Sequence, residues 1–321
     1  MIETYLSWIE TEIRKQRFGT KPASLYEPIH YIMALGGKRI RPMLTLLSYS
    51  LYKGDPLTIV KYAAAVEAFH NFTLLHDDIM DQAPLRRGKA TVHEKWDVNT
   101  AILSGDVMLV KVYGMFLDLQ AEKLQPVLKL FNQCAASVCE GQQWDMEFES
   151  KKSVSEKEYI NMIRLKTAVL LGFSLELGAV LADAPVEDQV RLRAAGENLG
   201  IGFQLKDDLL DVYGDKRKFG KQVGGDIMAN KKTFLLIRAL EDARGADAKE
   251  LTTWLKAKKF DRRKKVTAVT ALYDRLGIHA LTEKKADEYF EKGFAGLRKL
   301  SANMKAEALI QFATALADRQ K

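Results

Sequence analysis

The sequence has few cysteines and prolines and no long apolar run. Its two cysteines, Cys134 and Cys139, exclude a disulfide framework, and two buried thiols are expected. Seven prolines leave no proline-rich linker. The longest apolar run, AVLLGFSLELGAVLA, contains Glu176 and is too short to cross a bilayer. The first residues, MIETYLSWIETEIRKQ, lack the apolar core of a secretory signal, so the cytoplasm is the expected compartment.

The excess of positive charge is small. The chain carries 49 Lys and Arg against 42 Asp and Glu, a formal net charge of +7. Much of the excess lies in KAKKFDRRKKV, residues 256–266, which is more typical of a solvated helix face than of a nucleic-acid interface. We therefore expect no nucleic-acid partner, whereas the basic residues described below favour a small anionic ligand.

Helical periodicity dominates the chain, and no convincing strand pattern occurs. Residues 58–82 place apolar side chains at helical spacing between Pro56 and Pro84, and residues 189–213 behave alike. Four further stretches also favour helices, namely 97–118, 126–149, 156–181 and 231–243. The pattern predicts an all-α fold with one domain over residues 1–321.

Two aspartate clusters recur at the ends of the two apolar helices. LLHDDIMDQAPLRRG (residues 74–88) holds the first, and FQLKDDLLDVYGD (residues 203–215) holds the second. Aspartates four residues apart share a helix face, where their charges repel, and the C-terminal end of a helix disfavours anions further. Mg²⁺ removes both problems, because it binds carboxylate oxygens and shares them with phosphates. The pair of clusters therefore predicts a magnesium site.

Basic residues accompany both clusters. GGKRIRP (residues 36–42) follows paired glycines, where backbone amides can approach a phosphate closely. Arg86 and Arg87 follow the first cluster, and arginine forks suit phosphate oxygens. Lys166 lies in an apolar stretch, where a lysine needs a partner. GKQVGGDIMANKKT (residues 220–233) follows the second cluster and supplies Lys221 and Lys231. Carboxylates and cations together indicate a diphosphate ligand held with metal.

The motifs GGKRIRP, LLHDDIMDQAPLRRG, RLKTA, GFQLKDDLLD and GKQVGGDIMANKKT, in this order, resemble those of the trans-isoprenyl diphosphate synthases, or polyprenyl synthetases. The similarity covers residues 30–240 and includes the tail ALIQFATALADRQK. It implies the isoprenoid synthase type I fold, a multi-helix bundle around a deep central cavity, usually as a homodimer. The implied reaction condenses isopentenyl diphosphate with an allylic diphosphate, using three Mg²⁺ ions bound with the allylic diphosphate.

The resemblance also implies a role for each matching residue. The predicted metal ligands and their supporting carboxylates are Asp77, Asp78, Asp81, Asp207, Asp208 and Asp211. The residues expected to bind the allylic diphosphate are Arg86, Lys166, Lys221, Lys231, Thr167 and Gln204. Those expected to bind isopentenyl diphosphate are Lys38, Arg41, His70 and Arg87. Within this set, the residues predicted to be catalytic are Asp77, Asp81, Asp207, Lys166 and Lys221.

Product length is expected to depend on the helix before the first aspartates. Phe72 lies five residues before Asp77, and Phe69 lies one turn further, so both could close the floor of the cavity. Ordinary core packing explains Phe69 equally well. By resemblance, an aromatic residue five before the first aspartate favours short products, so a C20 product is expected first and a C15 product second.

Other functions fit less of the sequence. Glu27 to His30 and Glu67 to His70 both match the Glu-x-x-His pattern of di-iron bundles, but that function would not explain either aspartate cluster. A class I terpene cyclase would not need GGKRIRP or the Arg86–Arg87 pair. A non-catalytic synthase subunit would be expected to have degraded aspartate motifs. A synthase of longer polyprenyl chains remains the alternative with the same chemistry.

Overall fold

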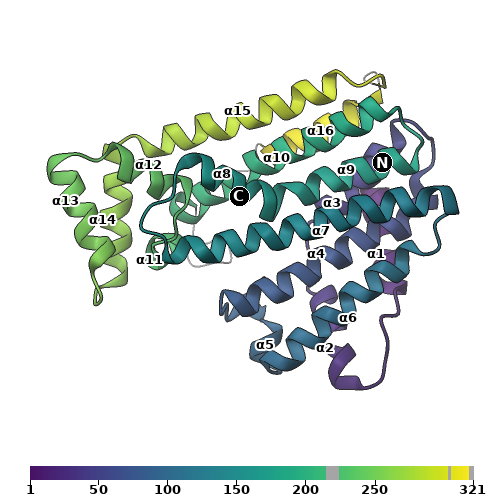
Figure 1. Ribbon diagram of the computed structural model, residues 1–321, viewed down its shortest axis with the longest axis horizontal. Helices are drawn as coiled ribbons and strands as arrows, with labels where there is room; N and C mark the ends of the chain where they lie inside the picture. Colours follow the sequence, from purple (N-terminus) through teal and green to yellow (C-terminus); the bar gives the residue numbers. More distant parts are fainter. Residues whose placement is uncertain (215–223, 303–304, 318–321) are drawn as a thin grey trace. The chain divides into compact units, whose positions relative to one another are not determined.

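The computed structural model describes residues 1–214, 224–302 and 305–317 (Figure 1). The described chain is almost entirely helical, as the periodicity predicted. It groups into two compact units, which are described separately. The first contains residues 1–135, 170–193 and 299–309, and the second contains 136–169, 194–298 and 310–321. The single domain predicted from the sequence stays a prediction.

Unit 1 consists of helices and one short hairpin. Its elements are α1 (Ile2–Lys15), α2 (Ala23–Ala34), α3 (Ile40–Ser50), the 3₁₀ turn η1 (Pro56–Ile59), α4 (Val60–Met80), β1 (Leu85–Arg86), β2 (Lys89–Ala90), α5 (Val92–Lys95), α6 (Val98–Phe116) and most of α9 (Val169–Leu181). In its core, Phe69 of α4 packs edge-on against Phe131, which also contacts Phe116 and Phe173. Aromatic side chains bury much apolar area each, so they dominate this core.

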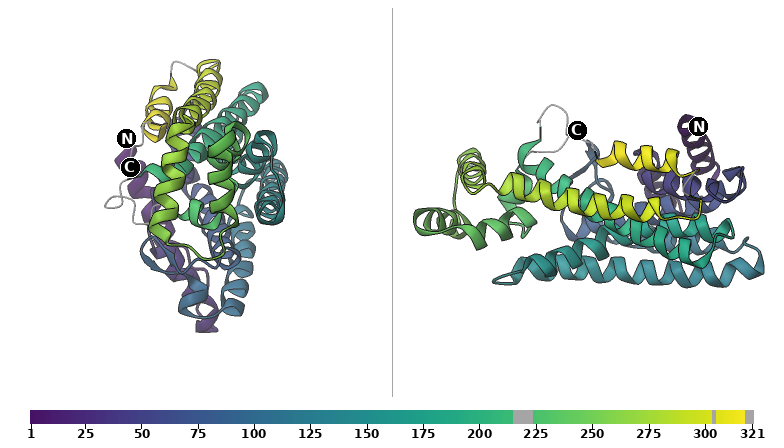
Figure 2. Two further views of the ribbon diagram at one scale, coloured as in Figure 1. Left: turned by 90° about the vertical axis from the view of Figure 1, so that its left-hand side faces the viewer. Right: turned by 90° about the horizontal axis from the view of Figure 1, so that it is seen from above.

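Unit 2 carries the later helices. Its elements are α8 (Glu156–Ile163), the π-helical turn η2 (Arg164–Ala168), α11 (Gly225–Ala229), α12 (Phe234–Asp242), α13 (Gly245–Lys256), α14 (Arg262–Arg275) and α15 (Ile278–Arg298). Four helices have residues in both units, namely α7 (Ala121–Ser150), α9, α10 (Val186–Tyr213) and α16 (Glu307–Ala317). The antiparallel pair α13 and α14 is visible in every view (Figures 1 and 2).

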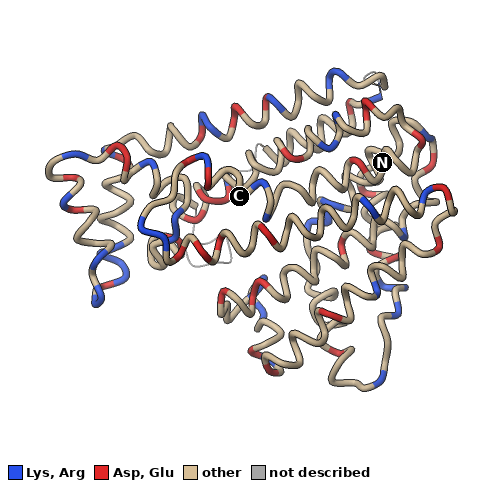
Figure 3. The backbone as a smooth tube through the Cα atoms, viewed as in Figure 1, with Lys and Arg blue, Asp and Glu red and all other residues tan. Residues whose placement is uncertain are grey.

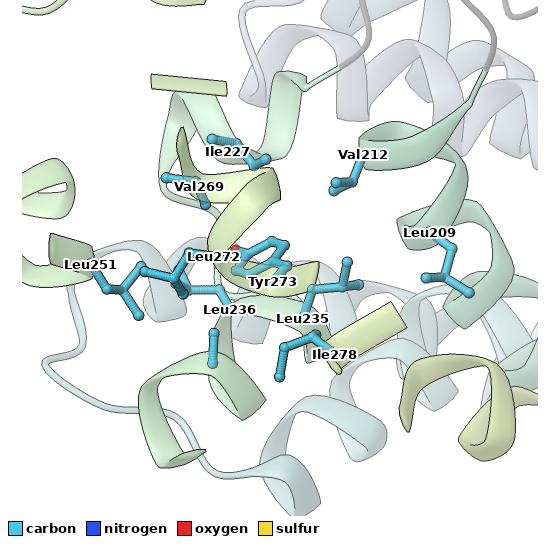
Figure 4. Packing of buried hydrophobic residues seen from close by; sticks show 11 residues of the cluster. Leu209, Val212, Ile227, Leu235, Leu236, Leu251, Val269, Leu272, Tyr273 and Ile278 are labelled. Atoms are coloured by element: carbon cyan, nitrogen blue, oxygen red, sulfur yellow. The ribbon is translucent and has the colours of Figure 1, made fainter. Parts of the chain in front are cut away.

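A buried apolar cluster joins the second aspartate helix to the helices that follow it in unit 2. Leu209 and Val212 of α10 belong to the same cluster as Ile227 of α11 and Val269 and Tyr273 of α14 (Figure 4). Sequence reasoning found no functional signal in residues 244–305. The cluster shows that α14 supports the segment next to the second motif.

The predicted helices are confirmed, with shifted ends. The helix predicted over 58–82 begins at Val60, because Asp55 caps a separate 3₁₀ turn, and it ends at Met80 with Asp81 as its C-cap. The helix predicted over 156–181 is interrupted by the π-helical turn η2. The helix predicted over 231–243 begins only at Phe234, so Lys231 lies in the preceding turn.

The prediction that the chain contains no strands was wrong for one short hairpin. Leu85 pairs with Ala90 and Arg86 with Lys89 in a two-stranded antiparallel hairpin. Its turn residues, Arg87 and Gly88, have φ of 52° and 73°. Such a turn reverses the chain within two residues, so the hairpin is too short to give an alternating sequence pattern.

Two further expectations can be compared with the structure. Neither cysteine is in a disulfide, but only Cys134 is buried, so the prediction of two buried thiols was wrong for Cys139. The run 256–266 is mostly exposed, and basic residues colour the loop end of α13 and α14 (Figure 3). Lys265 is the exception and is fully buried. Among the described helices, none is long and apolar enough to span a membrane.

Candidate active site

The first aspartate cluster lies at the end of α4. Asp77 is half-buried, Asp78 is buried and Asp81 is exposed at the helix C-cap. The Asp81 backbone N–H donates to the Asp77 carbonyl at 2.8 Å, which continues the helical turn. Asp77 and Asp81 therefore follow one another along the helix, as the four-residue spacing predicted.

The middle aspartate of this cluster forms a two-pronged ion pair with Arg86. The Arg86 Nε donates to both Asp78 oxygens at 2.8 and 2.9 Å, and its Nη2 lies 2.7 Å from Asp78 Oδ1. Asp77 is 3.7 Å from the same guanidinium. Burial raises the pKa of Asp78, and the bound arginine opposes that shift. Asp78 is thus oriented to hold Arg86, which agrees with its predicted supporting role.

Arg41 and His70, two of the four residues predicted to bind isopentenyl diphosphate, contact one another, and a third, Arg87, contacts the paired glycines before Lys38. Arg41 Nη1 donates to His70 Nε2 at 3.1 Å, and Arg87 Nη1 donates to the Gly36 carbonyl. Gly37 has a φ of 146°, a backbone conformation that favours glycine, and a Cβ there would lie 2.9 Å from the Arg87 guanidinium. Lys38, the fourth, is exposed.

The histidine in this group is electrically neutral. Arginine is only a donor, so His70 Nε2 must be the acceptor. Burial and the charges of Arg41 and Arg87 hold the pKa of His70 well below its usual value. The imidazole therefore orients Arg41 without adding positive charge.

Sequence reasoning missed Arg39. This N-cap residue of α3 is buried, has a φ of 48°, and donates to Glu10 and Glu67 at 2.7 Å each. The two ion pairs fix the backbone between Lys38 and Arg41. The signal available in the sequence was Glu67, an acidic residue inside an apolar helix.

In unit 2, the π-helical turn η2 brings Lys166 to the buried Asp145 of α7. Lys166 Nζ donates to Asp145 at 2.6 Å, and Lys231 Nζ lies 3.4 Å from the same carboxylate. A Cβ on Gly141 would lie 2.2 Å from the Lys166 backbone nitrogen, so glycine allows α7 to approach η2. Burial opposes ionisation, yet Lys231 and Lys166 together lower the pKa of Asp145. Sequence reasoning missed Asp145, although it predicted that Lys166 needs a partner.

Within the described residues, the hydrogen-bond donors to the middle aspartate of the second cluster are neutral side chains. Tyr159 donates its hydroxyl to Asp208, and Gln204 Nε2 donates to Asp208 at 3.1 Å. Gln204 in turn accepts from Thr167 Oγ1 at 3.1 Å. Burial and the nearby Asp226 raise the pKa of Asp208 well above its usual value. Thr167 and Gln204 are thus in contact, and their role in binding the allylic diphosphate stays a prediction.

The last aspartate of the second cluster contacts the turn that follows it. Asp211 Oδ2 accepts from the Asp226 backbone N–H at 2.9 Å, and the Asp211 carbonyl accepts from Gly224 at 2.6 Å. Asp207 is half-buried on the same helix. Lys221, also predicted to be catalytic, lies outside the described residues.

The carboxylates of the two clusters suit Mg²⁺ ions whose coordination is completed by the phosphates of the substrate. Among residues 1–214, 224–302 and 305–317, no three His, Cys, Asp or Glu side chains are already grouped as a metal cage. Mg²⁺ is usually bound by one or two carboxylates together with substrate phosphates, and it needs no such cage. Asp77 with Asp81 and Asp207 with Asp211 each offer two carboxylates that are not fully buried. The residues therefore fit the metal.

The predicted floor residues belong to the aromatic core of unit 1. Phe69 and Phe72 lie on one face of α4 with ring centroids 5.7 Å apart, and both are buried. Phe72 also contacts His76 at 4.8 Å, one residue before Asp77. This packing agrees with a rigid wall next to the first cluster, and the role in product length stays a prediction.

Comparison with known proteins identifies the family. The polyprenyl synthetase family model matches residues 22–273. A short chain isoprenyl diphosphate synthase of Methanocaldococcus jannaschii is 44% identical over 69% of this chain and 68% of its own length. A geranylgeranyl pyrophosphate synthase of Geoglobus acetivorans is 36% identical over 93% of this chain and 92% of its own. In a crystal structure, a geranylgeranyl pyrophosphate synthase superposes with a TM-score of 0.92 at 43% identity, over 99% and 98% of the two chains.

The chain belongs to the polyprenyl synthetase family. This finding confirms the resemblance drawn from the motifs, and with it the all-α isoprenoid synthase fold and the prenyltransferase class. The di-iron alternative loses its support in the structure, because Glu67 is bound by Arg39 and His30 contacts the Gly19 carbonyl.

Proposed function

We infer that this enzyme condenses isopentenyl diphosphate with an allylic diphosphate in head-to-tail fashion to give a short-chain product. The observation that carries this proposal is the grouping of predicted diphosphate ligands within each unit. Arg41, His70 and Arg87 lie together in one unit, and Lys166 and Lys231 share Asp145 in the other. Each group is a ready binding site for a polyanion. The relatives named geranylgeranyl diphosphate synthase support the same reaction class.

Arg41 and Arg87 hold isopentenyl diphosphate in this proposal, with Lys38 as an exposed third cation. The neutral His70 keeps Arg41 oriented, and Gly36 keeps Arg87 oriented. This substrate keeps its diphosphate throughout the reaction, so these residues position its double bond and do not need to stabilise a leaving group.

Lys166, Lys231 and Lys221 hold the allylic diphosphate, with Arg86 and the Thr167–Gln204 pair. Their positive charges stabilise the negative charge that develops on the leaving diphosphate. Lys166 and Lys231 are anchored by Asp145, so they need little reorganisation when that charge forms. Asp78 does the same for Arg86.

Magnesium is the proposed cofactor, and the resemblance implies three ions. Asp77, Asp81 and Asp207 would hold them, with Asp78, Asp208 and Asp211 as supporting or water-bridged carboxylates. When bound, Mg²⁺ neutralises phosphate charge and acts as a Lewis acid on the leaving group.

The reaction balances without a side-chain nucleophile. The allylic carbon–oxygen bond breaks, and its electron pair leaves with the diphosphate. The double bond of isopentenyl diphosphate then forms the new carbon–carbon bond to the allylic cation. A proton is lost from the adjacent carbon, and the released diphosphate is the proposed base. The enzyme's own side chains bind and orient the substrates and exclude water from the cation.

The proposed product is C20, with C15 as the second candidate. Phe72 and Phe69 would form the floor that stops elongation. The names of the relatives include geranylgeranyl and geranylfarnesyl diphosphate synthases, which supports a short product and leaves more than one length open.

A homodimer is the proposed assembly. Apolar side chains on one face of α6 and at its C-cap are exposed, namely Ile102, Leu103, Val110 and Leu117, with 39 to 67% of their surface accessible. Leu103, Val110 and Leu117 recur every seven residues, the spacing at which one helix packs along its own copy. Leu103→Glu with Val110→Glu should convert a dimer to a monomer in sedimentation velocity, and an unchanged mass would contradict this interface.

Product analysis tests the proposed function. The purified chain is incubated with Mg²⁺, isopentenyl diphosphate and, separately, C5, C10 and C15 allylic diphosphates. A C20 or C15 product, lost on adding EDTA and restored by Mg²⁺, would support the proposal. A C30 or longer product would keep the chemistry and reject the floor. Cyclisation of an allylic diphosphate would reject the proposed function in favour of a cyclase. No elongation by folded protein would reject it in favour of a partner-dependent subunit.

A further inference from the structure

Lys265 differs from every other basic residue in the run 256–266. It is fully buried in α14, whereas its neighbours Arg263 and Lys264 are exposed. Burial lowers the pKa of Lys265. A buried lysine is costly unless its ammonium group has partners, so its contacts show what it is for.

In the part of the chain that the structure describes, the Lys265 ammonium group contacts one turn and the ring of Phe260. Lys265 Nζ donates to Asn230 Oδ1 at 2.6 Å and to the Met228 carbonyl at 3.3 Å. It also lies 4.3 Å from the centre of the Phe260 ring. Met228 and Asn230 are at the C-terminal end of α11, so Lys265 ties α14 to that end.

The turn held by Lys265 leads directly to a predicted substrate ligand. Asn230 has a φ of 53°, and its Nδ2 donates to the Leu255 carbonyl at 3.2 Å. The next residue is Lys231, whose backbone N–H donates to the Asp226 carbonyl at 2.9 Å. Its ammonium group lies 3.4 Å from Asp145. The position of the Lys231 side chain therefore depends on the conformation of Asn230.

The other end of α11 is tied to Asp211, a predicted carboxylate of the metal site. The Asp226 backbone N–H donates to Asp211 Oδ2, and Gly224 donates to the Asp211 carbonyl. The short helix thus connects Asp211 at one end with Lys231 at the other. A rotation or shift of α11 would move both residues together.

Helix α14 is the support on which α11 rests. Ile227 of α11 and Val269 of α14 lie in one buried cluster (Figure 4). A Cβ on Gly224 would lie 2.8 Å from the Val266 side chain, so the backbone of α11 is packed closely on α14. Apolar contacts of this kind hold two elements together but fix their rotation poorly. The directional bonds of Lys265 supply that restraint.

We propose that Lys265 is a positioning residue, which fixes α11 on α14 so that Asp211 and Lys231 keep their places for the metal-bound allylic diphosphate. It does not touch the substrate. The proposal deepens, and rests on, the proposed function. Removing a group that orients a ligating residue typically lowers metal affinity or activity by about 10- to 100-fold.

The test compares Lys265→Met with Leu251→Ala. Methionine keeps most of the apolar stem and removes the ammonium group. Leu251 is buried in the same cluster but on α13, so its truncation is a control for lost stability. For each variant, the Michaelis constants for the allylic diphosphate and for isopentenyl diphosphate are measured, and thermal unfolding is recorded. Calorimetry measures the binding of inorganic pyrophosphate with Mg²⁺.

Lys265→Met should raise the Michaelis constant for the allylic diphosphate and the dissociation constant for Mg²⁺-pyrophosphate by about 10-fold. The Michaelis constant for isopentenyl diphosphate should change less than twofold, because Arg41, His70 and Arg87 belong to the other unit. Leu251→Ala should leave all three constants unchanged. Equal changes for both substrates, changes matched by Leu251→Ala, or no change would overturn the proposal.

A second variant covers the case in which Lys265→Met does not fold. Asn230→Gly accepts a positive φ without strain and removes the side-chain acceptor of Lys265, leaving only the longer bond to the Met228 carbonyl. It should reproduce the selective loss, and unchanged constants would overturn the proposal. Inactive wild-type protein would reject the proposed function, and the pyrophosphate measurement would still decide the role of Lys265.

Discussion

The two aspartate clusters share one sequence pattern but differ in how the structure holds the middle residue. Asp78 and Asp208 are both buried. Asp78 is bound by the guanidinium of Arg86, whereas Asp208 is bound by the Tyr159 hydroxyl and the Gln204 amide. The first is therefore a buried ion pair, and the second is a carboxyl group among neutral donors.

This difference changes the charge of each cluster. Burial raises the pKa of both carboxyls; Arg86 opposes that rise at Asp78, whereas the negative charge of Asp226 adds to it at Asp208. Positive charge in the second unit is instead gathered by Asp145, which holds Lys166 and Lys231. Two motifs with the same residues therefore differ in electrostatics, because the partners of their aspartates come from different elements.

The largest expected effect is a loss of kcat, and it should be the same for both aspartate clusters. Asp77→Asn and Asp207→Asn should each lower kcat about 100-fold or more, because each removes a proposed metal ligand at the leaving group. Steady-state kinetics at saturating Mg²⁺ measures this. Asp118→Asn, at an exposed ion pair with Lys61, is the control and should stay within about twofold of wild type. Near-normal kcat in one variant would show that the clusters are not equivalent.

The middle aspartates should differ in stability. Asp78→Asn leaves Arg86 without its charged partner and should cost about 3 kcal/mol, whereas Asp208→Asn replaces a carboxyl that favours the neutral form and should cost about 1 kcal/mol. Urea unfolding without Mg²⁺ gives both free energies. Equal costs, or the reverse order, would remove the contrast between the ion pair and the neutral site.

Product length should respond to the first unit only. Phe72→Ala should lengthen the product by at least one isoprene unit, because it opens the wall next to Asp77. Phe148→Ala in unit 2 truncates an equally buried phenylalanine and should leave the product unchanged. Each variant should lose about 3 kcal/mol of stability, so the pair is matched for that loss. Chromatography of the products tests this, and an unchanged length in Phe72→Ala would reject the floor.

The smallest effect should be a pH dependence confined to the first unit. The pKa of His70 is well below its usual value, so between that value and about 6.5 the unfolded chain binds a proton that the folded chain does not. Stability should therefore fall as pH falls, by about 1 kcal/mol between pH 7.5 and 5.5.

Urea unfolding of His70→Gln at the same two pH values provides the control. Glutamine does not titrate, so this part of the pH dependence should disappear. The same slope in variant and wild type would show that another group is responsible.

The sequence allowed the helices and most site residues to be predicted, because these depend on local spacing. The periodicity located α4 and α10, and the four-residue spacing located the aspartates at their ends. The partner of Asp78 was also local, since Arg86 follows eight residues later, directly before the two-residue hairpin turn.

Other contacts depend on packing between distant segments. Tyr159 reaches Asp208 across 49 residues, and Asp145 reaches Lys166 across 21 residues. The interruption at η2 was not visible either, because π-helical and α-helical turns place apolar residues almost alike over one turn. The buried Lys265 was assigned to a solvated run because its partners, Met228 and Asn230, lie 37 and 35 residues away along the chain.

By itself, the sequence determined the all-α class, the order of the motifs and the residues proposed to carry the chemistry, because helix periodicity and carboxylate spacing are local properties. Only the tertiary structure decided which carboxylates stay exposed and which bury against arginine, tyrosine or lysine. Burial and partner choice set the charge of each group, and both depend on elements that are distant along the chain.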